Sequence, residues 1–346
     1  MKNMISACVL SMLLVNFCNI MAHGWASRYS IDIVHKNRNN LQKRQAVIVE
    51  QPLQEPASQL IFSWNAHRPA HGHYAFYVQV RLQGSKRWSD WYKIAEWGNG
   101  VQRSFEQLMQ DDPSFCYVRL EAPNGFLVQE CRLKIEAHDQ ASLIDVARVT
   151  ISAVDYHQFV SEYGKGRRFS FPSVRLNHVP AFSQMESRHP ERDRICSPTS
   201  LAMVVSYLLK RYIDPTQFAN GVYDDGLKSY GSWPFNVAYA FDLTGGRFYF
   251  AVTRLNSFAQ LYSFLHKRLP VVVSVRGPLH TMPQGKTYAD GHLLVVIGWD
   301  DVHKRVIVLD PAFETRQAVL HSYAIDDFLA AWERSYRLAY VVEPAG

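Results

Sequence analysis

One cysteine stands where a polar stretch of the sequence changes to a helical apolar pattern. Cys196 is followed by Ser-Pro-Thr-Ser and then by apolar residues at every third or fourth position. This spacing predicts an amphipathic helix with one buried face. Ser197 suits the N-cap and Pro198 the first turn, so we expect the helix to begin just after Cys196. The residues of the apolar face are Leu201, Val204, Val205, Leu208, Leu209 and Tyr212.

A thiol at the start of a helix can be chemically reactive. The unpaired backbone N–H groups and the positive end of the helix dipole both favour thiolate over thiol, which makes a cysteine nucleophilic near neutral pH. The alternative is a buried structural cysteine. The chemical role also requires a base within reach of the sulfur, a group that orients this base, and donors for an oxyanion.

A histidine and an aspartate stand at the ends of two neighbouring predicted strands. His292 opens the strand in 291–300, and Asp310 closes the strand in 305–310. Taken alone, the histidine could be a surface residue and the aspartate, which precedes a proline, a turn former.

The short turn between these strands sets their register. It pairs Trp299 with Arg305, which places His292 opposite Ala312 and Asp310 one step diagonal on the same face. A base and a carboxylate therefore converge at one sheet edge. Spacing alone does not show that Cys196 meets them.

The elements around these residues differ between the two halves of the chain. From about 45 to 155 the sequence consists of short alternating strands, such as 59–66 and 73–82, which predicts a β-sandwich. From about 173 onward, predicted helices come first and antiparallel strands follow, which is an α+β arrangement. The predicted helices, apart from the one after Cys196, are 233–243, 257–269 with Ser257 as N-cap, and 325–335.

Two cysteines of the first half lie on alternating segments joined by a turn signal. Cys116 and Cys131 flank Pro123-Asn124-Gly125, which predicts a hairpin. The sequence leaves two interpretations of this pair: the cysteines form a disulfide, or both are buried free thiols.

The tryptophans of the first half also have two interpretations. The favoured interpretation is that these side chains fill the core of the sandwich, and the alternative is that they form a platform on which sugars stack. The residues are Trp64, Trp88, Trp91 and Trp97.

The N-terminus and the charge of the chain bear on its location and partners. Residues 1–22 combine a lysine, an apolar run and small residues, which predicts a signal peptide, with a retained membrane anchor as the alternative. We expect a secreted or periplasmic protein without stable membrane insertion after removal of this segment. The net charge of +6 is spread along the chain, which argues against a nucleic-acid partner. The expected organisation is a β-sandwich domain over 23–158, a linker over 159–172 and a catalytic domain over 173–346.

Several motifs together resemble the bacteriocin-processing, C39-like cysteine peptidases of the papain-like fold, and in particular secreted bacterial members with an N-terminal β-domain. The motifs are "VPAFSQ", "CSPTSLAMVVSYL", "SWPFNVAYAF", "GHLLVVIGWD", "VIVLDPAF" and, in the first half, "SWNA". The resemblance implies that Cys196 is the nucleophile, His292 the general base, Asp310 the residue that orients it, and Gln184 an oxyanion donor. Ser197 replaces the glycine common in the family, and we expect the polar segment "MESRHPERDR" between Gln184 and Cys196 to loop outward.

These observations lead to a functional prediction with two alternatives. We expect a cysteine peptidase that hydrolyses amide bonds of a peptide or protein substrate, with cell-wall peptide as one option, and that needs no metal or organic cofactor. The first alternative is an acyltransferase on the same fold. The second is a protein whose β-domain binds a cell-surface polymer and whose thiol site is inactive.

Overall fold

The computed structural model describes residues 24–33, 41, 44–108, 113–164, 169–279 and 286–346. The fold mixes helices with antiparallel sheets, as predicted. The predicted signal segment and residues 165–168 of the predicted linker lie outside the described residues. Within the described ranges, no helix has the length and apolar character needed to cross a membrane.

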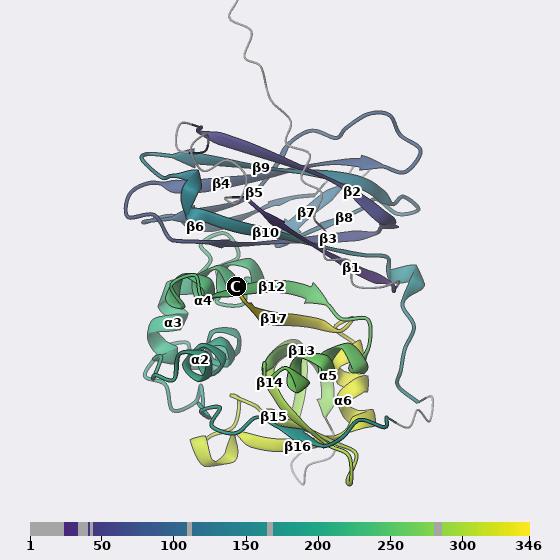
Figure 1. The fold of residues 1–346 in the computed structure, drawn as a ribbon, viewed down its shortest axis with the longest axis vertical. Helices are drawn as coiled ribbons and strands as arrows, with labels where there is room; N and C mark the ends of the chain where they lie inside the picture. The colour runs from purple at the N-terminus through teal and green to yellow at the C-terminus, as the bar shows by residue number, and fades with distance from the viewer. Residues whose placement is uncertain (1–23, 34–40, 42–43, 109–112, 165–168, 280–285) are drawn as a thin grey trace, which may run out of the picture.

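Ten strands of the first half form one continuous sheet that folds over into two layers (Figure 1). The order is β1-β10-β3-β8-β7-β6-β5-β4-β9-β2, and β6 pairs with β5 in one layer and β7 in the other. Trp64 on β3 stacks on Phe76 on β4 with ring centroids 4.1 Å apart, so an apolar core lies between the layers. The strands are β1 (Ala26–Asp32), β2 (Ala46–Ala57), β3 (Gln59–Ala66), β4 (His73–Leu82), β5 (Tyr92–Gly98), β6 (Gln102–Gln107), β7 (Ser114–Tyr117), β8 (Arg119–Glu121), β9 (Val128–His138) and β10 (Val146–Val154).

The predicted hairpin around Pro123-Asn124-Gly125 is wrong. β8, before this turn, pairs with β3 and β7, whereas β9, after it, pairs with β4 and β2. The turn therefore carries the chain from one layer to the other. Cys131 is a buried free thiol, so the disulfide alternative is not realised; the side chain of Cys116 lies outside the described part of the structure.

The four tryptophans divide between the core and the surface. Trp64 and Trp97 are buried between the layers, as predicted. Trp88 and Trp91 are half-exposed, and the core prediction is wrong for them. The Arg132 guanidinium lies 3.9 Å from the ring centre of Trp88. Arginine and lysine stems cover aromatic faces well, which stabilises such rings at a surface.

The second half is built on a second antiparallel sheet with helices on both sides (Figure 1). Its strands follow the order β12-β17-β13-β14-β15-β16, and β11 (Val174–Arg175) pairs with β14. The long strands are β12 (Phe248–Arg254), β13 (Val271–Leu279), β14 (Lys286–Asp300), β15 (Arg305–Leu309), β16 (Leu320–Ala324) and β17 (Leu338–Pro344). The helices are α2 (Cys196–Leu209), α3 (Pro215–Val222), α4 (Trp233–Leu243), α5 (Phe258–His266) and α6 (Ile325–Glu333).

The predicted helices of this half are present. α4 coincides with the predicted 233–243, and Ser257 caps α5 by accepting a hydrogen bond from the backbone N–H of Gln260 at 3.2 Å. Tyr212 is an exception to the predicted apolar face of α2: it lies beyond the helix, which ends at Leu209, and is 68% exposed.

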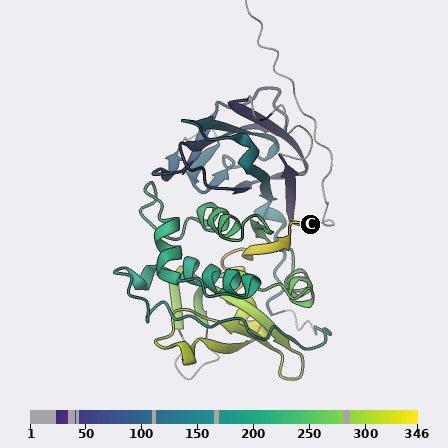
Figure 2. The ribbon, with the colours of Figure 1, turned by 60° about the vertical axis from the view of Figure 1, so that its left-hand side comes forward.

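Helix α4 and strand β12 join the two halves (Figure 2). Phe235 of α4 packs edge-on against Trp64 of β3, with ring centroids 5.6 Å apart. β12 is an edge strand, whose free backbone groups need partners. The Asn65 amide on β3 supplies them: it donates to the carbonyl of Phe250 at 2.9 Å and accepts from the N–H of the same residue at 2.7 Å. β3 is therefore buried on both faces, and the two halves hold a defined relative position.

Candidate active site

Cys196 is the first residue of α2. The preceding Ile195 has a non-helical backbone, and the helix propagates from there. The predicted N-cap is wrong, because the Ser197 hydroxyl bonds the Tyr340 hydroxyl at 3.0 Å instead of a backbone N–H of the first turn. The thiol keeps the predicted position at the helix N-terminus, and its sulfur is hydrogen-bonded to the backbone at Ser197 and Leu293.

His292 and Asp310 lie beside this thiol and are buried. Nε2 of His292 is 2.8 Å from Oδ1 of Asp310. The imidazole also hydrogen-bonds the Cys196 sulfur, and Nδ1 is the ring nitrogen left for that bond. The structure thus brings together the thiol, the base and the carboxylate that the sequence placed on three separate elements.

The register that sets His292 near Asp310 differs from the predicted one at the turn but not at the site. Asp300, not Trp299, pairs with Arg305. A bulge between Val296 and Gly298 then shifts the pairing by one residue, so that Val295 lies opposite Leu309. The offset at the turn and the offset from the bulge are opposite in direction, so they cancel, and the predicted register holds at the end of the strand that carries His292.

The three groups perturb one another's protonation. Burial raises the pKa of the Cys196 thiol, but the charge of His292 and hydrogen bonds from it, Leu293 and Ser197 outweigh burial and hold this pKa below its ordinary value. Burial lowers the pKa of His292, and the charges and hydrogen bonds of Asp310 and Cys196 outweigh this and raise it. Opposite shifts in the two partners favour a thiolate–imidazolium pair at neutral pH.

Gln184 lies in the same cleft as the thiol and the imidazole, and only 2% of it is exposed. Its backbone N–H donates to the carbonyl of Pro311 at 2.9 Å, which fixes it beside the residue that follows Asp310. Its side-chain Oε1 has no hydrogen-bond partner among the described residues. An amide oxygen only accepts hydrogen bonds, so the group of this side chain that could donate to an oxyanion is its Nε2.

Two tyrosines complete the site, and neither was predicted. The Tyr288 hydroxyl donates to Oδ2 of Asp310 at 2.7 Å, and its ring stacks on the His292 imidazole with centroids 4.1 Å apart. The Tyr323 hydroxyl lies 3.3 Å from the same Oδ2. The backbone N–H of Ala312 donates to Oδ1 at 3.0 Å. The one available signal was the even spacing of Tyr288 and His292 on a strand, which puts both on one face.

We expect Tyr288→Phe to lower kcat/KM about tenfold, because it removes one hydrogen bond to the buried carboxylate and keeps the ring over the imidazole. Tyr288→Ala should lower it further, since it also removes the stacking. Steady-state kinetics would measure both. Tyr262→Phe is a matched control, because the Tyr262 hydroxyl bonds the Pro172 carbonyl away from the cleft. Wild-type kcat/KM in both Tyr288 variants would contradict a positioning role.

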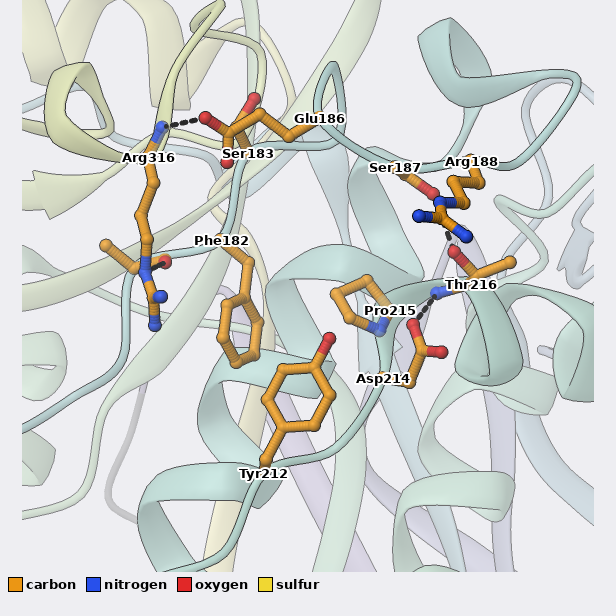
Figure 3. Close-up of a pocket in the computed structure, with 11 residues that line it drawn as sticks. Phe182, Ser183, Glu186, Ser187, Arg188, Tyr212, Asp214, Pro215, Thr216 and Arg316 are labelled. Atoms are coloured by element: carbon orange, nitrogen blue, oxygen red, sulfur yellow. Dashed lines mark hydrogen bonds between the residues drawn. The ribbon is translucent and has the colours of Figure 1, made fainter.

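The cleft that holds these groups has a volume of about 790 Å³ and is lined from both halves of the chain. Trp233 and Leu293 line it beside the thiol, and Arg119, Glu121 and Tyr156 reach it from the first half. A second pocket of about 460 Å³ lies elsewhere, between Phe182, Tyr212, Arg188 and Arg316, and contains none of the three groups (Figure 3). The segment "MESRHPERDR" contributes to its wall through Glu186, Ser187 and Arg188.

A thiol at a helix N-terminus, an imidazole and a buried carboxylate in one cleft are the arrangement that acyl-transferring thiol enzymes use. A family model that matches the chain agrees with this class of enzyme and narrows it to peptidases. Residues 176–340 match the model of the Peptidase_C39 like family, so this part of the chain is similar to C39-like peptidases, and the protein is a cysteine peptidase.

Solved structures with similarity to the chain include two peptidases. A C39-like peptidase from Bacillus anthracis is 19% identical, with a TM-score of 0.38, over 50% of this chain and 98% of that one. Xylellain, a cysteine protease from Xylella fastidiosa, is 11% identical, with a TM-score of 0.34, over 54% of this chain and 95% of that one. No curated protein matches the chain.

Proposed function

We propose that this protein is an exported cysteine peptidase that hydrolyses amide bonds with Cys196, His292 and Asp310 as a catalytic triad. The observation that carries the proposal is the hydrogen-bonded chain from thiol to imidazole to buried carboxylate, with Nε2 of His292 2.8 Å from Asp310. We further propose that the first half is a β-sandwich domain over 23–158, joined by the linker 159–172 to a papain-like domain over 173–346.

The reaction begins with the ion pair. The Cys196 thiolate attacks the substrate carbonyl carbon and forms the C–S bond, and the carbonyl electron pair moves to the oxygen. The side-chain amide of Gln184 and the backbone N–H of Cys196 hold this oxyanion; the second is one of the N–H groups that a helix start leaves unpaired. The imidazolium then gives its proton to the leaving nitrogen as the C–N bond breaks.

The second half of the reaction releases the acyl group. His292, now neutral, takes a proton from water, the hydroxide attacks the thioester, and the C–S bond breaks to restore the thiolate and imidazolium. Asp310 keeps the imidazole oriented and stabilises its positive charge throughout. This scheme assigns no step to a metal or an organic cofactor.

Alkylation of the native protein tests the state of the thiol. We expect iodoacetamide to modify Cys196 with a pH midpoint below 9, because the pKa of this thiol is lowered in the fold. Peptide mapping by mass spectrometry would follow the rate at Cys196 against pH. The denatured chain is the control and should titrate at the ordinary value. An unreactive Cys196 at neutral pH would contradict the proposed nucleophile.

The acyltransferase alternative differs in the acceptor of the acyl group. Wild-type enzyme given a cleavable peptide and an added amine would form the new amide if it is a transferase and the free acid if it is a hydrolase. A binding role for the first half would use the exposed parts of Trp88 and Trp91 that Arg132 and Lys134 leave uncovered, and binding of a cell-wall polymer to the whole protein would test it.

Export is the remaining part of the proposal, and it rests on the pattern of residues 1–22. We expect the mature chain to begin near His23. Intact-mass measurement of protein recovered from outside the cytoplasm would show the loss of the first segment. Recovery of the full-length chain in the membrane fraction would support the anchor instead.

A further inference from the structure

Four arginines from four different elements gather on one wall of the cleft. We call them the arginine cluster: Arg119 of β8, Arg254 at the end of β12, Arg276 of β13 and Arg334 just after α6. Arg119 comes from the first half of the chain and the others from the second, so the cluster exists only because the two halves are joined.

Arg254 places a charge without an ion-pair partner among the described residues in the wall of the cleft. It is 5% exposed, and its guanidinium donates to neutral acceptors: Gln59 Oε1 at 2.9 and 3.0 Å, the Tyr156 hydroxyl at 3.0 Å, and the carbonyls of Ser335 at 2.6 Å and Tyr336 at 3.1 Å. Among the described residues, no carboxylate lies within 4.0 Å of it. The hydrogen bonds are satisfied, and the Glu121 carboxylate acts on the positive charge only from beyond ion-pair distance, through Gln59 between them.

Two more members of the cluster are exposed to the cleft without an acidic partner. The Arg334 guanidinium donates to the carbonyls of Arg276 at 3.1 Å and Pro278 at 3.4 Å, which holds it beside Arg276. In the part of the chain that the structure describes, neither arginine forms an ion pair.

Of the four arginines, Arg119 is the one that has a carboxylate partner among the described residues. Its Nε is 2.7 Å from Glu121 Oε1, and this oxygen also accepts from Gln59 at 2.7 Å. In the described part of the chain, the cluster of four guanidinium groups therefore forms a single ion pair, that of Arg119 with Glu121.

The cluster borders the catalytic strand. Val275, next to Arg276, pairs with His292 in the sheet. The Ser274 hydroxyl on the same strand donates to the Ser335 hydroxyl at 3.2 Å, which ties the loop after α6 to the strand beside His292. The other charged residues of the cleft are Asp193, Arg194 and Asp290. None of these three forms an ion pair with a cluster member in the described ranges.

We propose that the arginine cluster is an anionic subsite of the substrate cleft, which selects peptides with a carboxylate near the cleaved bond and to which the N-terminal half contributes Arg119. This inference rests on the proposed peptidase function. A cleft wall with an excess of one charge concentrates ligands of the opposite charge, and arginine pairs with carboxylates through two parallel hydrogen bonds. The substrate carboxylate can be an aspartate or glutamate side chain or a free C-terminus.

Paired peptides test this selection. For each position around the cleaved bond, a glutamate peptide is compared with the matched glutamine peptide, and a free C-terminus with the C-terminal amide. We expect kcat/KM to be at least about tenfold higher for the acid of one pair, the equivalent of one charged contact. A preference in a side-chain pair identifies an acidic residue, and one confined to the terminal pair identifies a carboxypeptidase-like mode. Equal values in all pairs would overturn the proposal.

Variants connect the preference to the cluster. Arg276→Gln and Arg334→Gln should each reduce the acid-to-amide ratio, and Arg276→Glu should bring it below one. Arg119→Gln tests the contribution of the first half. Arg188→Gln, in the pocket of Figure 3, is the matched control and should leave the ratio unchanged. An unchanged ratio in all four cluster variants would assign the preference to other residues and overturn the proposal.

A binding measurement separates this proposal from the catalytic one. Cys196→Ala protein is titrated with the same acid and amide peptides by calorimetry, at low and high salt. Tighter binding of the acid that weakens with salt supports the subsite even if the wild type cleaves no peptide. Equal binding of both forms contradicts the subsite and leaves the triad unaffected.

Discussion

Replacement of Cys196 with alanine should abolish peptide hydrolysis and leave the protein folded. Turnover should fall at least about 10⁴-fold, because the attacking atom is gone and the remaining oxyanion donors cannot replace it. The thermal midpoint should move by no more than about 4 °C, since the sulfur lies at a cleft wall and its removal creates little cavity. The two measurements are kinetics on a peptide that the wild type cleaves and a thermal melt by circular dichroism.

The matched control for this variant is Cys131→Ala. Cys131 is a buried thiol in the first half, far from the triad in the sequence and on a different sheet. The Cys131→Ala variant should be less stable, because removal of the buried sulfur leaves a cavity, and the fraction that folds should keep wild-type turnover. A Cys196→Ala protein that kept wild-type hydrolysis would reject Cys196 as the nucleophile and with it the proposed mechanism.

Removal of the imidazole should be nearly as damaging. His292→Ala should lower kcat/KM about 10³-fold or more, because the thiol loses the partner that lowers its pKa and the leaving nitrogen loses its acid. Without His292, burial is the dominant influence and raises the pKa of Cys196. Alkylation of Cys196 in this variant should therefore be slow at pH 7 and recover as the pH rises.

Asp310→Asn is the comparison that separates orientation from proton transfer. The asparagine keeps the shape of the buried group but removes the negative charge that raises the pKa of His292. We expect a smaller loss than in His292→Ala, together with a lower imidazole pKa by NMR titration. If Asp310→Asn and His292→Ala left kcat/KM at the wild-type value, the hydrogen-bonded chain would be structural rather than catalytic.

Part of this site was predictable because its signals are short-range. The position of Cys196 at a helix start follows from the apolar period of the next residues, and the approach of His292 and Asp310 follows from one short turn between two strands. Even here the details came from packing. Ser197 does not cap the helix because its hydroxyl faces Tyr340, and a bulge before Gly298 corrects the register that the turn alone would set.

The sequence by itself determined the elements, since periodicity and capping act within one or two turns of chain. β3, β4 and α4 begin and end where their patterns do, and Ser257 caps α5. Only the tertiary structure decided which segments meet. The turn at Pro123-Asn124-Gly125 is a real turn, yet its two strands join different neighbours, because strand pairing depends on the distant segments with which each strand can bury its apolar face. For the same reason no local pattern could bring Arg119 from the first half into the cleft of the second.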